Sequence, residues 1–243
     1  MLLFPKTKEE WDKLGEELDS YSAEKVLEEI VKRLSNHGEI LFLTAFGPEG
    51  CVILEILSKI DQAKQIKIAN LDTGYQFQET LELKDKFENK YNLSIQIVSP
   101  ELSVAEQDER YGKNLFERDP DQCCYMRKLV PLNKLLEGKY AWISSIRKEQ
   151  TEVRAKSKII EFDNKFQLGK INPLVNWTKS DVWKYIHENQ IPYNLLLDKG
   201  YDSIGCEPCT KPGQDREGRW AGKDKVECGL HLQDTKQGGE YFI

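Results

Sequence analysis

The chain has 243 residues, of which 39% are hydrophobic and 31% are charged, and its formal net charge is −6. This composition is ordinary for a soluble globular protein, and the length fits one α/β domain. The acidic balance argues against a nucleic-acid partner bound through a basic face. No apolar run approaches the roughly 20 residues that cross a bilayer, and the first residues turn charged too soon for a secretory signal. We therefore expect a cytoplasmic enzyme with no membrane partner.

Residues 1–38 are expected to form helices. Apolar side chains recur at helical spacing between residues 6 and 36, with a predicted break at Gly15. Ser22 is a plausible start for the second helix. We expect this face to be core and assign it no chemistry.

The first diagnostic unit is a strand over residues 39–46, a glycine turn and a helix over residues 51–60. A strand, a glycine turn and a helix can present backbone N–H groups to phosphate. No Gly-Lys-Ser/Thr follows, so the turn is not a Walker A motif. An ordinary tight turn explains Gly47 and Gly50 at least as well. Cys51 is expected to be a buried structural thiol.

A second strand over residues 66–70 runs into Asp72, Thr73 and Gly74. Loops at the carboxyl ends of strands are where α/β folds bind ligands. A helix over residues 77–91 and a third strand over residues 93–98 follow. This alternation predicts a parallel sheet with right-handed crossovers.

A fourth strand is predicted over residues 140–144, after a helix that ends near Gly138. Arg147, Gln150 and Arg154 follow it at spacings of three and four, which puts them on one face if the stretch coils. A solvated basic patch is the usual explanation for such a group. Its position after a strand favours an anion site here.

The rest of the core is expected to hold a hairpin or meander over residues 162–175 and a helix over residues 182–189. Thr178 and Asp181 have the spacing of a capping box. We place the nucleotide-binding core at residues 39–200. The glycine-rich residues 201–243 are expected to form a mobile tail.

The cysteines are the most specific signal. Without a secretory signal, six of them are typical of thiols, metal ligands or catalysts rather than of a disulfide framework. Cys206 and Cys209 form a Cys-x-x-Cys pair that can place two thiolates on one metal centre. Cys228, close to arginines that can hold oxyanions, can be a nucleophile. On this segment alone, a zinc knuckle among solvated charges explains the pattern equally well.

Across nearly its whole length the sequence resembles the thioredoxin-dependent assimilatory adenylyl-sulfate reductases. The most specific resemblance lies in the adjacent pair Cys123-Cys124, in Cys206-x-x-Cys209 and in the run from Glu227 to His231. Further similar segments are the turn at residues 45–47, residues 71–74, the Arg147 group and residues 216–220.

The resemblance implies a single α/β domain with a mainly parallel sheet, similar to the adenine nucleotide α-hydrolases. It implies a 4Fe–4S cluster on Cys123, Cys124, Cys206 and Cys209. The substrate-binding residues that it implies are Phe46, Gly47, Asp72, Thr73, Gly74, Lys128, Arg147, Arg154, Arg216 and Arg219.

The implied reaction belongs to sulfate assimilation and cysteine biosynthesis. The Cys228 thiolate attacks the sulfur of adenylyl sulfate, AMP leaves, and reduced thioredoxin (or glutaredoxin) releases sulfite from the S-sulfocysteine. Lys128 is placed to link the cluster and the substrate electrostatically. Nearby cations lower the pKa of Cys228 whereas Glu227 raises it, so the sequence does not predict a thiolate in the free enzyme.

Three alternatives stay open. A 3′-phosphoadenylyl-sulfate reductase, or an enzyme that uses both nucleotides, shares the tail motif, although that branch typically lacks the four cluster cysteines. A zinc-stabilised nucleotide-binding module with no redox role would be colourless, whereas an iron–sulfur protein is brown. A sulfur-transfer enzyme acting on tRNA is disfavoured by the acidic charge. The sequence does not decide whether the chain forms a homo-oligomer.

Overall fold

Strands from distant parts of the chain form one sheet in the order β3-β2-β1-β4-β6-β5. The structure is a computed structural model that describes residues 4–34, 36–60, 63 and 65–231. All neighbouring strands are parallel except β5, which pairs antiparallel with β6 at the edge. The predicted mainly parallel α/β sheet is confirmed. The strands are β1 (Ile40–Leu43), β2 (Lys67–Leu71), β3 (Ile95–Val98), β4 (Ala141–Ile143), β5 (Ile160–Asp163) and β6 (Leu168–Ile171).

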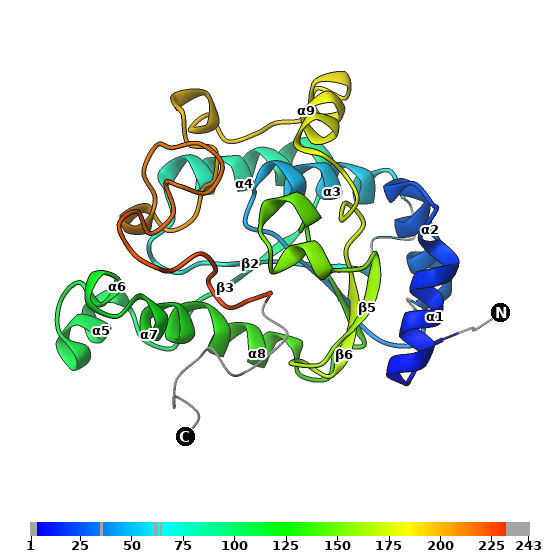
Figure 1. The fold of residues 1–243 in the computed structure, drawn as a ribbon, viewed down its shortest axis with the longest axis horizontal. Helices are drawn as coiled ribbons and strands as arrows, with labels where there is room; N and C mark the ends of the chain where they lie inside the picture. Colours follow the sequence, from blue (N-terminus) through cyan, green and yellow to red (C-terminus); the bar gives the residue numbers. More distant parts are fainter. Residues whose placement is uncertain (1–3, 35, 61–62, 64, 232–243) are drawn as a thin grey trace.

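Helices cover both faces of the sheet. Figure 1 shows α3 and α4 on one side, α8 on the other, and α1 and α2 at the β5 end. The helices are α1 (Lys8–Leu18), α2 (Ala23–Leu34), α3 (Pro48–Ser58), α4 (Gln78–Tyr91), α5 (Val104–Tyr111), α6 (Leu115–Arg118), α7 (Pro120–Cys124), α8 (Val130–Leu136) and α9 (Lys179–Glu188).

The central strands bury alternate side chains in two separate cores. Ile40 and Phe42 of β1 pack into the core beneath α3, and Leu41 between them joins Trp142 in the core beneath α8. A parallel sheet covered on both faces needs such nearly continuous apolar strands. The short strands therefore hold the loops at their carboxyl ends in fixed positions.

Gly15 does not break the first helix, which contradicts the sequence-based prediction. Helix α1 runs through it from Lys8 to Leu18, and the chain turns only before α2. A Cβ atom at Gly15 would lie 2.5 Å from the carbonyl oxygen of Ile160. The glycine lets α1 lie directly on β5.

Gly15→Ala is therefore expected to lower the free energy of unfolding by about 1–3 kcal/mol, because the added methyl group overpacks the helix–strand contact. Helix propensity alone predicts the opposite sign, a gain of about 1 kcal/mol. Urea denaturation of Gly15→Ala beside the exposed-site control Glu16→Ala measures the difference. Stabilisation by Gly15→Ala would show that the contact is not close.

Several local predictions are confirmed. The Ser22 hydroxyl accepts a hydrogen bond from the Lys25 amide at 3.3 Å. Thr178 and Asp181 form the expected capping box at the start of α9. β5 and β6 form the expected hairpin, but β6 also pairs with β4 and so lies inside the sheet.

The tail is described as far as residue 231 and packs against the core. Trp220 is 3% exposed, and Leu230 packs against the core cluster that contains Trp142. Within the tail, short bridges join Gly213 to Tyr201 and Arg219 to Thr210. Figure 1 shows this orange-to-red segment running between the layer of α4 and that of α7 and α8. Residues 213–231 thus have one defined position here, their movement stays a prediction, and residues 232–243 lie outside the described residues. No described helix combines the length and apolar character needed to cross a membrane.

Candidate active site

A cavity of about 620 Å³ opens at the carboxyl ends of the central strands. Its lining includes Thr44 and Ala45 after β1, Thr73 after β2 and Ser145 after β4. Strand order reverses between β1 and β4. Open α/β sheets bind ligands at such a switch point.

The cavity gathers most of the expected substrate-binding residues. Phe46, Asp72 and Gly74 are not in its lining. Phe46 is buried, and Asp72 accepts a hydrogen bond from the Gly74 amide at 2.8 Å, which shapes the loop after β2. The expected residues in the lining are Gly47, Thr73, Lys128, Arg147, Arg154, Arg216, Arg219 and Cys228.

Carboxylates neutralise one end of the cavity. Arg147 Nε lies 2.7 Å from Glu49, and its Nη1 lies 2.9 Å from Glu149. Lys179 lies 2.8 Å from Asp202 and 3.4 Å from Asp215. Each of these cations already faces two acidic groups, so this end offers little net attraction for an anion.

Lys128 and Arg219 differ from those paired cations. Neither has a carboxylate within ion-pair distance among the residues that the structure describes. The Arg219 guanidinium lies 4.5 Å from the Trp220 ring centroid. A Cβ atom at Gly205 would lie 2.2 Å from Arg219 Nη2, so a larger residue there would require the Arg219 guanidinium to shift. In the described part of the chain, no carboxylate therefore offsets the charge of either cation.

The Cys228 thiol faces this cationic end of the cavity. Burial raises the pKa of Cys228, but Lys128, the Leu230 amide and Arg219 lower it enough to outweigh burial and the opposing charge of Glu227. Taken together, these effects lower the pKa of Cys228. The nearby cations therefore outweigh Glu227, and the pKa of Cys228 lies below its ordinary value.

We expect the alkylation rate of Cys228 to reach half its maximum at a lower pH than that of an ordinary exposed thiol, because its pKa is lowered. A lowered pKa means that the thiolate is fully formed above that pH and is lost as pH falls through it. Cys51, whose pKa burial raises, should stay unreactive over the same range. Iodoacetamide labelling against pH, with peptide mass analysis, measures both; equal profiles would contradict the assignment.

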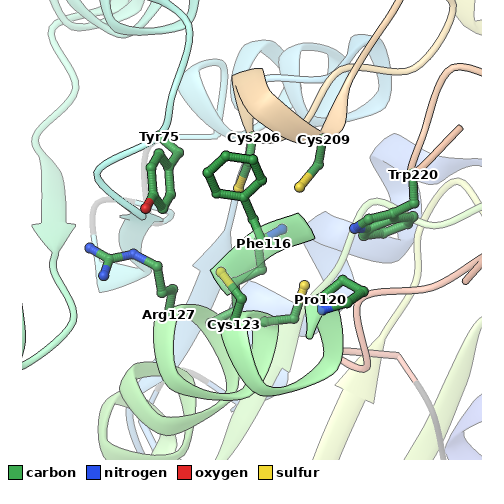
Figure 2. Close-up of a pocket in the computed structure, with 10 residues that line it drawn as sticks. Tyr75, Phe116, Pro120, Cys123, Arg127, Cys206, Cys209 and Trp220 are labelled. Carbon is green, nitrogen blue, oxygen red and sulfur yellow. The ribbon is translucent and has the colours of Figure 1, made fainter. Parts of the chain in front are cut away.

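A second, smaller cavity is lined by all four expected cluster cysteines. Figure 2 shows the sulfur atoms of Cys206 and Cys209 pointing toward Cys123 on the opposite helix. A bridge between Gln76 and Cys206 fixes the Cys-x-x-Cys segment beside the loop after β2. Two segments far apart in the sequence thus present their thiols to one space.

The thiols need a positive centre to ionise together. Burial, and then its neighbour Cys124, raise the pKa of Cys123 to about 12, and burial raises that of Cys124 to about 11. No described group of three or more His, Cys, Asp or Glu side chains is arranged around a single metal ion. Trp220 Nε1 is buried without a hydrogen-bond partner, at the edge of the same cavity. The cavity therefore combines four thiols with one buried N–H donor that has no partner among the described residues.

Lys128 lines both cavities. Burial lowers the pKa of Lys128, but the Cys206, Cys124 and Cys228 sulfurs together raise it above its ordinary value. The ammonium is therefore charged. It lines the four-cysteine cavity on one side and the cavity that contains Cys228 on the other, and its expected electrostatic role stays a prediction.

A π-helical turn over Tyr125–Leu129 follows the adjacent cysteines and carries Lys128. Such turns are frequent at functional sites. Within it, Arg127 is buried, donates to the Thr73 carbonyl and donates at 3.0 Å to Gln107. Arg127 thus holds the cysteine helix against the loop after β2, a role that no sequence spacing signalled.

Other cavity residues were also missed from the sequence. Glu49 lies in the glycine turn and lines the cavity, although the sequence of that turn indicates a role only for its backbone. His231 belongs to the tail motif but was given no role; its ring stacks on Trp142 with centroids 5.6 Å apart. Burial, and then the charge of Arg154, hold the pKa of His231 well below its ordinary value. The pairing of Lys179 with Asp202 has no local signal at all.

A family profile for the phosphoadenosine phosphosulfate reductase domain matches residues 39–212. An adenosine 5′-phosphosulfate reductase 2 of Bacillus subtilis is 47% identical over 203 residues, which are 81% of this chain and 85% of that protein. An adenosine 5′-phosphosulfate reductase of Bacillus cytotoxicus is 41% identical and covers 96% of this chain and 100% of its own length.

Among solved structures, a phosphoadenylyl-sulfate reductase from Candida auris in complex with phosphate is 31% identical. It covers 84% of this chain and 97% of its own, with a TM-score of 0.73. An FMN adenylyltransferase from Candida glabrata, 18% identical, covers 79% of this chain and 62% of its own with a TM-score of 0.56, and it shares the fold.

Proposed function

The chain belongs to the phosphoadenosine phosphosulfate reductase domain family, and we propose that it reduces adenosine 5′-phosphosulfate to sulfite and AMP in sulfate assimilation. The names of relatives at 41–47% identity support this substrate. The observation that carries the proposal is the position of Cys228. It lines a cavity of about 620 Å³ together with Lys128 and Arg219, which have no carboxylate within ion-pair distance among the described residues.

In the proposed reaction the Cys228 thiolate attacks the sulfur of the sulfate group. The new S–S bond forms as the bond between sulfur and the bridging phosphate oxygen breaks, and AMP leaves with that electron pair. Lys128 and Arg219 offset the negative charge that the nucleophile and the sulfate bring together. Cys228 then carries an S-sulfo group.

An external dithiol completes the cycle in this proposal. A thiolate of reduced thioredoxin or glutaredoxin attacks Cys228 Sγ, sulfite leaves, and the donor's second thiol releases Cys228 as the donor becomes a disulfide. Cys51 cannot resolve the adduct, because it is fully buried and its thiol faces the Phe46 carbonyl. All six cysteines are free thiols, which suits the reducing cytoplasm.

The proposed cofactor is a 4Fe–4S cluster on Cys123, Cys124, Cys206 and Cys209. Support comes from the four thiols that line one cavity and from the unpaired Trp220 Nε1 beside them. When bound, the cluster supplies a rigid cross-link between α7 and the tail. Lys128 lines both cavities and would offset negative charge on the cluster and on the substrate.

Arg219→Ala is expected to weaken binding of adenosine 5′-phosphosulfate about 10- to 100-fold, because it removes a charge-assisted contact that no carboxylate offsets. Arg147→Ala should weaken it less, because Arg147 is shared between Glu49 and Glu149. Titration calorimetry on a variant that cannot turn over measures both affinities. AMP is the control ligand, because the difference between the two ligands reports the contact with the sulfate group. Equal losses for both ligands would place Arg219 away from the sulfate.

Sulfite release with reduced thioredoxin tests the function itself. Adenosine 5′-phosphosulfate should be turned over faster than 3′-phosphoadenosine 5′-phosphosulfate. The reverse preference would assign the chain to the other branch of the family, and release from neither would refute the reductase.

A further inference from the structure

Glu227, immediately before Cys228, is a buried carboxylate held by two side chains of one other segment, Thr151 and Arg154. Its side chain is only 3% exposed. Arg154 Nε lies 2.7 Å from one carboxylate oxygen, and Arg154 Nη2 donates to the other at 2.9 Å. The Thr151 hydroxyl donates at 3.0 Å. Burial alone would raise the pKa of Glu227, but Arg154 lowers it below its ordinary value, so the group is ionised.

The same carboxylate meets a third donor from within the tail. Arg216 Nη2 lies 3.5 Å from Glu227 and donates at 2.8 Å to the Val226 carbonyl. The segment before Cys228 is therefore fastened through both its side chain and its backbone. A buried carboxylate that receives several charged donors is costly to separate from them.

The residues after Cys228 are held by weaker and mostly apolar contacts. Lys165 Nζ donates to the Gly229 carbonyl at 2.9 Å. Leu230 packs on the core beneath α8, and His231 stacks on Trp142. Gly229 has φ of +92° and faces Leu129, so the chain turns sharply directly after the nucleophile. Asp202 and Asp215 also tie the tail to Lys179 of α9, but Glu227 is the buried carboxylate next to Cys228.

We propose that Glu227 is a positioning residue that latches the tail on Arg154 and so holds Cys228 over the cationic end of the cavity. Arg154 then acts on the tail rather than on the substrate, because its Nε and Nη2 already face the Glu227 carboxylate. This inference rests on the proposed function only for the identity of the reaction. The latch itself is a property of the free protein.

The test uses Glu227→Gln in the full chain, with Asp224→Asn as a matched control. Asp224 is exposed, lies three residues earlier in the same tail, and its replacement removes the same charge. Amide hydrogen exchange over residues 224–231, measured without nucleotide, should become about 10- to 100-fold faster in Glu227→Gln and stay unchanged in Asp224→Asn. Equal exchange in the two variants would overturn the latch.

Single-turnover kinetics then distinguish positioning from binding. With saturating adenosine 5′-phosphosulfate and no reductant, Glu227→Gln should form the Cys228 adduct about 10- to 100-fold more slowly, while its affinity for AMP stays within about twofold. Arg154→Ala should likewise slow adduct formation while leaving the affinity for AMP nearly unchanged. The double variant should form the adduct only slightly more slowly than either single variant. If Arg154→Ala weakened nucleotide binding but left amide hydrogen exchange over residues 224–231 unchanged, Arg154 would be a substrate-binding residue instead. If wild type forms no adduct at all, the proposed function fails, and the exchange result still decides the latch.

Discussion

Cys228→Ser is expected to lower sulfite formation about 10⁴-fold or more, because a serine hydroxyl has no comparably acidic nucleophilic atom at neutral pH. The variant should keep its affinity for AMP, since Lys128, Arg219 and the loops after β1, β2 and β4 are unchanged. It should also keep its iron. Steady-state sulfite release, AMP binding and iron content are the three measurements.

Cys51→Ser is the matched control for this substitution. Cys51 is buried against the core, and burial raises the pKa of its thiol. Turnover of Cys51→Ser should stay close to that of wild type. If Cys228→Ser still formed sulfite and Cys51→Ser did not, Cys51 would be the nucleophile and the mechanism would be refuted.

The second large effect is expected at the four-cysteine cavity. Cys123→Ser should lose iron and turnover together, and its melting temperature should fall by roughly 5–15 °C. The physical reason is that the proposed cluster joins α7 to a segment more than 80 residues further along the chain. Without the cross-link, the Cys-x-x-Cys loop is held only by contacts such as the 2.7 Å bond from the Glu207 amide to the Tyr75 carbonyl.

Visible absorption and metal analysis of the anaerobically purified protein separate the two cofactor hypotheses. A brown protein with iron and sulfide supports the cluster, whereas a colourless protein with one zinc ion supports the zinc-stabilised module. Full iron and full turnover in Cys123→Ser would remove Cys123 from the ligand set.

Features encoded by neighbouring residues were predictable from the sequence. The alternating strands and helices, the Thr178 capping box and the burial of Cys51 each depend on spacing within one segment, and the structure contains all three. The cysteine pattern was specific enough to indicate the family before any fold was known.

Features that depend on distant pairs were not predictable. The sequence indicated that Arg147 and Arg154 would face an anion, but it did not show that Glu49 and Glu227 lie beside them. Those partners are separated by 98 and 73 positions along the chain. The role of Gly15 also depends on a distant residue. A glycine within a helical pattern predicts a break, and only the contact with Ile160 of β5 explains why a glycine lies inside the helix.

The pairing of cavity arginines with carboxylates changes which cations are expected to bind the substrate. Composition alone treats all arginines around the cavity as equivalent anion binders. The structure separates those already matched by carboxylates from Lys128 and Arg219, which are not. Electrostatic attraction for the substrate is therefore concentrated beside Cys228, where the sulfur must lie for attack.

The mass of the Cys228 peptide after incubation with adenosine 5′-phosphosulfate, without any reductant, tests this account most directly. We predict one added SO₃ group on Cys228, with release of one AMP, and loss of that mass when reduced thioredoxin is supplied. An unmodified Cys228, or an SO₃ group on any other cysteine, would contradict it.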